Sequence, residues 1–239
     1  MIRTICLFLL LAAAPLVAQD TSGSASPIPI AQQRTDLASA LLNQGSVDSR
    51  TSGAFAIVPR EQFLPVYLRS IAYQDTALPL GAGLALASPS DIGRAISGLV
   101  LKPTDRVLIY GSATGYAAAL VSRLASNVED VELDSAQRTE NQRLFTALGY
   151  SNIAVAGPAI PSGPAGRGSY DAILINGAVA SVPATITRLL AATGRLVAPI
   201  RDANGLQIMV ELSIESGGAI ALRSLGKAFF VPIQTTAGS

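Results

Sequence analysis

The sequence contains no histidine and a single cysteine, so it has few of the residues that most often serve as general bases, nucleophiles and metal ligands. That cysteine, Cys6, lies in an apolar N-terminal segment that we expect to be removed. The remaining chain would then have no disulfide, no thiol nucleophile and no thiolate ligand. We therefore expect no metal site and no reaction that depends on a histidine base.

Charged side chains are also scarce, at 14% of the sequence against 49% hydrophobic residues, which favours a sizeable folded core. The length of 239 residues suggests one main domain. Removing Arg3 from the 17 basic residues leaves 16, which balance the 16 acidic residues. Because no basic tract is present either, we expect neither nucleic acid nor an anionic membrane as a partner.

The first eighteen residues have the pattern of a secretory signal peptide. Arg3 precedes an apolar run over 5–17, and Ala18 is a small residue at a plausible cleavage point. The run is shorter than the roughly 20 residues of a membrane-spanning helix. We expect cleavage after residue 18, export to the periplasm or the medium, and no stable membrane insertion afterwards. An uncleaved N-terminal anchor is the alternative, because Leu16 is unusual at the third position before the cut.

Beyond the signal peptide, residues 19–35 lack hydrophobic periodicity and predict a flexible leader, and 36–239 predict a single domain. In that domain, apolar strand patterns alternate with helical ones, which favours an α/β fold: a mostly parallel, doubly wound sheet with an antiparallel C-terminal hairpin. Residues 77–89 read as a loop, with Ser90 or Asp91 capping the helix that follows. The expected strands are 106–110, 128–133, 152–155, 170–175 and 195–200, with a hairpin of 207–214 and 219–225; the expected helices are 91–99, 116–125, 136–148 and 182–190.

The turn after the first core strand carries the strongest functional signal. Gly111 and Gly115 occupy the outer positions of a G-x-G-x-G turn whose middle position is Ala113. In such folds, ligands bind beyond the carboxyl ends of the strands, where glycines let the backbone approach them. Glu132, about 20 residues further on, has the spacing of a carboxylate that binds a ribose hydroxyl. Alternatively, the glycines serve packing and Glu132 is a solvated strand end.

Eight separate segments carry a further signal through their order in the chain: 58–63, 72–75, 78–81, 105–108, 148–152, 170–173, 194–199 and 230–232. In this order they resemble the protein-L-isoaspartate O-methyltransferase family, and the resemblance covers about 36–233. It implies a Rossmann-like methyltransferase fold and transfer of a methyl group from S-adenosylmethionine to isoaspartyl carboxylates of damaged proteins.

The resemblance also implies site residues. It assigns the cofactor to Gly111, Ser112, Gly115, Tyr116 and Glu132. It assigns the substrate to Leu80, Gly81, Ser88, Phe230, Val231 and Pro232, with Ser88 as the candidate catalytic hydroxyl.

The chain departs from the family pattern at positions that the resemblance assigns to cofactor and substrate binding. Ile109 and Pro158 replace acids, Ala113 replaces the central glycine, and Ala85 and Ala87 replace a threonine and a serine. Because methyl transfer to a carboxylate depends on positioning, these losses predict slow or absent methylation. A second hypothesis is therefore an exported binding or scaffold protein on the same fold. A third, a nicotinamide-dependent oxidoreductase, explains the turn and Glu132 but none of the flanking segments.

Overall fold

The computed structural model describes residues 28–158, 168–215 and 219–233. The predicted signal peptide lies outside these residues, as does the leader up to residue 27. The prediction of a flexible leader as far as residue 35 is wrong at its end, because the first helix, α1, spans Ile30–Asn43. Its Leu37, Ala38 and Leu41 are buried, so packing against the domain accounts for helix where the sequence has little periodicity.

The segment before the main sheet forms a helical layer with a small hairpin. Residues 78–86, expected to be a loop, instead form two antiparallel strands whose connecting residues, Ala82 and Gly83, both have positive φ (49° and 76°), as a tight primed turn requires. Helix α3 is capped by Ser88, not by Ser90 or Asp91. The elements are α2 (Ser49–Ile57), η1 (Arg60–Phe63), η2 (Val66–Ile71), β1 (Leu78–Gly81), β2 (Leu84–Leu86) and α3 (Pro89–Gly98).

The remaining elements build a seven-stranded sheet of order β5-β4-β3-β6-β7-β8-β9. Neighbours from β5 to β7 are parallel, and β8 is antiparallel to both β7 and β9, which confirms the predicted fold class. The strands are β3 (Arg106–Tyr110), β4 (Asn127–Val131), β5 (Ile153–Ala156), β6 (Tyr170–Ile175), β7 (Leu190–Arg201), β8 (Gln207–Ile214) and β9 (Ile220–Lys227). The helices between them are α4 (Tyr116–Val121), α5 (Ser135–Ala147) and α6 (Ala184–Thr187). The helix expected over 182–190 is thus only four residues long, because β7 begins at Leu190.

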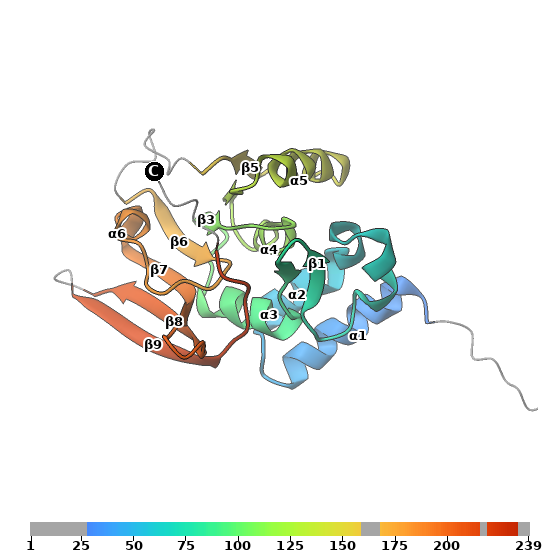
Figure 1. Ribbon diagram of the computed structural model, residues 1–239, viewed down its shortest axis with the longest axis horizontal. Helices are drawn as coiled ribbons and strands as arrows, with labels where there is room; N and C mark the ends of the chain where they lie inside the picture. Colours follow the sequence, from blue (N-terminus) through green and yellow to red (C-terminus); the bar gives the residue numbers. More distant parts are fainter. Residues whose placement is uncertain (1–27, 159–167, 216–218, 234–239) are drawn as a thin grey trace, which may run out of the picture.

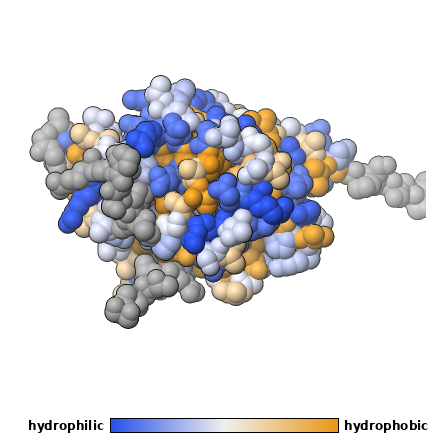
Figure 2. All heavy atoms as spheres, turned by 90° about the horizontal axis from the view of Figure 1, so that it is seen from above, coloured by the Kyte–Doolittle hydropathy of each residue, from blue (hydrophilic) through white to orange (hydrophobic). Residues whose placement is uncertain are grey.

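The sheet is covered unequally on its two faces (Figure 1). On β3, Val107 and Ile109 face the larger hydrophobic cluster, which includes side chains of α1 to α5. Leu108 and Tyr110 face the smaller cluster, to which α6 contributes Ile186. This alternation follows from the two-residue period of a strand. Outside the core, Figure 2 shows hydrophobic atoms in several separate places among hydrophilic ones. None of the described helices is long and apolar enough to cross a membrane.

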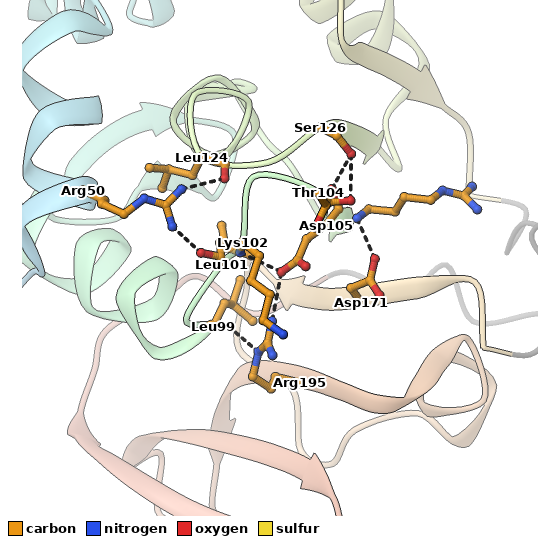
Figure 3. Close-up of polar contacts among 11 residues, drawn as sticks. Arg50, Leu99, Leu101, Lys102, Thr104, Asp105, Leu124, Ser126, Asp171 and Arg195 are labelled. Carbon is orange, nitrogen blue, oxygen red and sulfur yellow. Dashed lines mark hydrogen bonds and ion pairs between the residues drawn. The ribbon is translucent and has the colours of Figure 1, made fainter.

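Polar contacts fix the edge of the sheet at which the parallel strands begin (Figure 3). The Asp105 carboxylate accepts hydrogen bonds from the Lys102 backbone N–H and from Arg195 Nη2, both at 2.9 Å. Arg50 donates to the carbonyl oxygens of Leu101 and Leu124. These contacts tie α2, β7 and the α3–β3 connection to one another.

Candidate functional site

A cavity of about 350 Å³ opens at the other edge, where the parallel strands end. Its walls come from five stretches that are separate in the sequence: the β1–β2 hairpin, the turns after β3, β4 and β6, and the C-terminal segment. It is lined by Ala82, Leu84, Ala85, Leu86, Ala87, Gly111, Ala113, Glu132, Leu133, Asp134, Asn176, Gly177, Phe230, Val231, Pro232 and Ile233. A second hollow of about 330 Å³ lies at the beginnings of the strands, where ligands of open α/β sheets do not normally bind. The first cavity is therefore the candidate site.

The turn after β3 keeps the predicted shape despite its alanine. Gly111, Ala113 and Gly115 have φ of 79°, 54° and 78°. A Cβ on Gly115 would lie 2.6 Å from the Phe145 ring, so glycine is required there on steric grounds as well. Ala113 adopts the left-handed conformation as an L-residue with a side chain, which costs about 1 kcal/mol.

A buried polar network beneath the turn offsets part of that cost. The Asn141 side-chain amide donates to the Ala113 carbonyl oxygen at 3.0 Å and to Asp130 Oδ2 at 3.3 Å. Asp130 is fully buried, and burial raises its pKa to about 7, against smaller opposing effects of the Ser112 hydroxyl and the Asn141 amide. The sequence analysis missed Asp130 and Asn141, because only the fold brings α5 beneath the turn.

Glu132 lies immediately after β4 and lines the cavity. Its Oε1 accepts a hydrogen bond from the Asp134 backbone N–H at 2.9 Å, whereas its buried Oε2 has no partner among the described residues. Burial raises the pKa of this carboxyl, and backbone N–H groups oppose the rise. A buried acceptor without a donor fits a ligand hydroxyl, so the residues present suit the ribose of a nucleoside cofactor.

The other predicted cofactor residues lie around the turn, but not all of them reach the cavity. Gly111 lines it. Ser112 and Gly115 belong to the turn without lining the cavity, and the Tyr116 side chain is fully buried between Phe55 and Phe63. This packing keeps the Tyr116 side chain away from the cavity, where a cofactor would bind.

Asn176, which the sequence analysis missed, lines the cavity after β6. Its side-chain amide donates to the carbonyl oxygens of Gly111 and Ser112, at 3.2 and 3.3 Å. It thereby holds the glycine turn against the end of the neighbouring strand. Its position directly after the apolar strand 170–175 is the signal that could have identified it.

The predicted substrate residues divide in the same way. Phe230, Val231 and Pro232 line the cavity, whereas Leu80 and Gly81 do not. Val231 accepts a hydrogen bond from the Ala178 N–H at 2.9 Å, and the Phe230 backbone pairs with the Gln207 side chain, so this segment is fixed to the sheet.

Ser88, the predicted catalytic hydroxyl, is also outside the cavity lining. Its Oγ accepts a hydrogen bond from the Asp91 N–H at 3.2 Å as the N-cap of α3. That structural role accounts for Ser88 without a catalytic one. Ala85 and Ala87, the positions without hydroxyls, do line the cavity.

Comparison with known proteins identifies the family. The sequence model described as protein-L-isoaspartate(D-aspartate) O-methyltransferase matches residues 32–238. The chain belongs to this family. A protein-L-isoaspartate O-methyltransferase of Roseiflexus sp. (strain RS-1) is 39% identical over 206 residues, covering 85% of this chain and 92% of the relative. That of Stenotrophomonas maltophilia is 34% identical over 200 residues, covering 84% and 88%.

Solved structures agree on the fold. A protein-L-isoaspartate O-methyltransferase from Plasmodium falciparum, in complex with S-adenosyl-L-homocysteine, superimposes with a TM-score of 0.71 at 20% identity, covering 84% of this chain and 98% of the other. Another protein-L-isoaspartate O-methyltransferase gives a TM-score of 0.74 at 25% identity, covering 86% and 67%. Enzymes of the family use S-adenosylmethionine, in agreement with the cofactor class expected from the sequence.

Proposed function

We propose that this protein binds S-adenosylmethionine and transfers its methyl group, at a low rate, to isoaspartyl carboxylates of proteins. Family membership supports the reaction type. The observation that carries the proposal is Glu132: it lines the cavity beside the glycine turn and keeps a buried carboxylate oxygen without a partner among the described residues. The bound cofactor would supply a methyl group activated by a sulfonium.

The chain's own residues have little acid–base work to do in this reaction. An isoaspartyl carboxylate is ionised at neutral pH, so the absence of histidine is no obstacle. The protein has to hold the carboxylate and the methyl donor in line and keep water away. Leu86, Phe230 and Val231 supply apolar walls for this purpose. At Ala85 and Ala87, however, no side-chain hydroxyl is available to orient the carboxylate, which is why we expect a low rate.

The second candidate function is a binding protein on the same fold that does not methylate. The observation that favours it is the position of Ala85 and Ala87 in the cavity wall, where the family pattern has hydroxyls. The two functions predict the same cofactor binding but different methyltransferase activity, so cofactor binding and activity both have to be measured.

The test combines calorimetric titration with S-adenosylhomocysteine and methyl incorporation into an isoaspartyl peptide, with its aspartyl twin as reference. We expect cofactor binding, slow isoaspartyl-selective turnover, and faster turnover in the double variant Ala85→Thr, Ala87→Ser. Ala154→Thr, at the hollow on the opposite edge, is the matched control. The reversion leaves Ile109 unchanged, because that side chain is fully buried in the core and a glutamate there would be a buried charge. Cofactor binding without turnover in either protein would favour the binding function, and no cofactor binding would reject the proposal.

We also propose that the protein is exported. The support comes from sequence alone: Arg3, the apolar run 5–17 and Ala18. N-terminal sequencing of the protein from its native host should begin near Gln19. An intact N-terminus on a cytosolic protein would refute export, and an intact N-terminus on a membrane fraction would indicate the anchor alternative.

A further inference from the structure

Arg60 is the most unusual charged residue near the site. It lies in η1 with none of its surface exposed. One guanidinium nitrogen, Nη2, donates to the Ala87 carbonyl oxygen at 3.0 Å. The other two, Nε and Nη1, have no hydrogen bond of normal geometry among the described residues. A buried guanidinium is costly in any protein unless its charge and its donors are satisfied.

The acidic side chains near Arg60 have other hydrogen-bond and ion-pair partners. Glu61, its sequence neighbour, pairs instead with Arg34 at 3.3 Å and also accepts a hydrogen bond from the Tyr73 hydroxyl. Asp75 is exposed, and its Oδ1 accepts from the Ser90 backbone N–H. No ion pair to Arg60 forms within the described ranges, and burial lowers the pKa of its guanidinium.

Arg60 contacts one residue of the cavity wall and one residue that directly follows the glycine turn. On one side it holds the backbone of Ala87, which lines the cavity at the end of the hairpin. On the other side its guanidinium carbon lies 4.9 Å from the centre of the Tyr116 ring, at the start of α4 directly after the glycine turn. Arg60 therefore lies between the segment assigned to the substrate and the segment assigned to the cofactor.

We propose that Arg60 is a specificity-determining residue whose positive charge selects a carboxylate-bearing substrate at the Ala87 end of the cavity. This inference rests on the proposed function. It assigns recognition of the substrate carboxylate to Arg60, because Ala85 and Ala87 provide no hydroxyl in the cavity wall. In a poorly solvated site, a positive charge acts over several ångströms, so Arg60 need not touch the substrate. The same charge would not attract the neutral methyl ester that the reaction forms, and would thus favour release of the product.

The test compares an isoaspartyl peptide with its methyl ester, each titrated into the full chain by calorimetry, with and without S-adenosylhomocysteine. We expect the wild-type protein to bind the carboxylate peptide at least about tenfold more tightly than the ester. Arg60→Met should bring this ratio close to one, and Arg60→Lys, which keeps the charge, should retain most of it. The affinity of Arg60→Met for S-adenosylhomocysteine should stay within about threefold of wild type.

Arg69→Met is the matched control, because Arg69 also donates to a backbone carbonyl, that of Leu64 at 3.2 Å, in the next short helix. It should leave the ratio unchanged. If the role of Arg60 is merely structural, Arg60→Met should weaken the binding of both peptides equally and leave the ratio of their affinities unchanged. That result would overturn the inference.

The wild-type protein and Arg60→Lys decide the matter alone if Arg60→Met does not fold. Equal wild-type affinities for the two peptides, no peptide binding at all, or loss of the ratio in Arg60→Lys would each overturn the assignment. Failure of the wild-type protein to bind S-adenosylhomocysteine would instead count against the proposed function. The titrations without S-adenosylhomocysteine still decide the role of Arg60 in that case.

Discussion

At the edge of the sheet where the parallel strands begin, buried charges are paired, whereas at the edge where they end, several buried polar atoms have no partner among the residues that the structure describes. The first edge has the Asp105–Arg195 ion pair and the carbonyl contacts of Arg50 (Figure 3). At the second edge, buried polar atoms without a hydrogen bond among the described residues belong to Arg60, Thr114, Tyr116, Asp130 and Glu132. The only other such atom in the described part of the chain is Arg94 Nε.

The difference between the two edges indicates that the first edge stabilises the fold and the second edge binds a ligand. Satisfied groups lower the free energy of the folded chain, while unsatisfied groups and left-handed backbone raise it. A protein retains unsatisfied polar groups where a bound ligand supplies their missing hydrogen bonds. We therefore expect substitutions at the first edge to change stability alone, and substitutions of cavity-lining residues at the second edge to change ligand binding as well.

The largest effect is expected at the paired edge. Asp105→Ala removes the carboxylate that accepts from Arg195 and Lys102, and leaves the largely buried Arg195 guanidinium without its ion-pair partner. Chemical denaturation should show a loss of about 3 kcal/mol in the free energy of unfolding. The folded variant should bind S-adenosylhomocysteine like the wild type.

Arg223→Ala is the control for this variant, because its ion pair with Glu211 is exposed on the arginine side. It should cost less than about 1 kcal/mol. Equal losses in the two variants would show that the first edge is not specially stabilised by its pairing.

The next effect concerns pH and Asp130. The pKa of this carboxyl is raised to about 7 by burial, above the value of about 4 expected in the unfolded chain. Between these values the folded protein binds more protons than the unfolded one, so stability should fall as pH rises from about 4 to about 7 and then level off. Asp130→Asn removes this titration and should raise the free energy of unfolding at pH 8 by roughly 1–3 kcal/mol.

Denaturation at pH 5 and pH 8 checks this expectation, because the gain should be much smaller at pH 5. Glu129→Gln is the control: this side chain on the same strand accepts a hydrogen bond from the Tyr170 hydroxyl at the opposite hollow. A gain in Asp130→Asn that does not change with pH would mean that the Asp130 carboxyl does not titrate in this range.

Glu132→Gln should separate binding from stability. The amide still accepts from the Asp134 N–H but is a weaker acceptor for a ligand hydroxyl. Calorimetry should show a loss of about 1–3 kcal/mol in S-adenosylhomocysteine affinity, with the free energy of unfolding unchanged or raised. Glu129→Gln should leave that affinity unchanged. Equal affinities of wild type and Glu132→Gln for S-adenosylhomocysteine would show that Glu132 only ends a strand and does not bind the cofactor.

The sequence predicts those parts of this molecule that depend on local pattern. Strand 170–175 is predicted with its observed bounds because a continuous apolar run suits a strand buried on both faces. Glu132 and the turn at 111–115 are found by their spacing. The hairpin over 78–86 is missed because Pro79, Gly81 and Gly83 are residues that favour a loop over strands, so the two short strands around the turn give little signal. Arg60, Asp130 and Asn141 are missed because their surroundings come from segments that only the folded chain brings together.

The smallest effect is expected at Ala113, and it bears most directly on the turn. Its φ of 54° is strained for alanine, so Ala113→Gly should raise the free energy of unfolding by about 0.5–1 kcal/mol. It also removes a methyl group from the cavity wall, so the affinity for S-adenosylhomocysteine should increase. Val100→Gly is the matched control. Val100 has φ 49°, is 60% exposed, and lies between the Leu99 and Leu101 carbonyls of the paired edge. It should gain stability by the same relief of strain and leave the affinity unchanged. If both variants gain stability but neither changes affinity, the alanine in the turn is no obstacle to the cofactor, and the low rate expected for this protein has to come from Ala85 and Ala87.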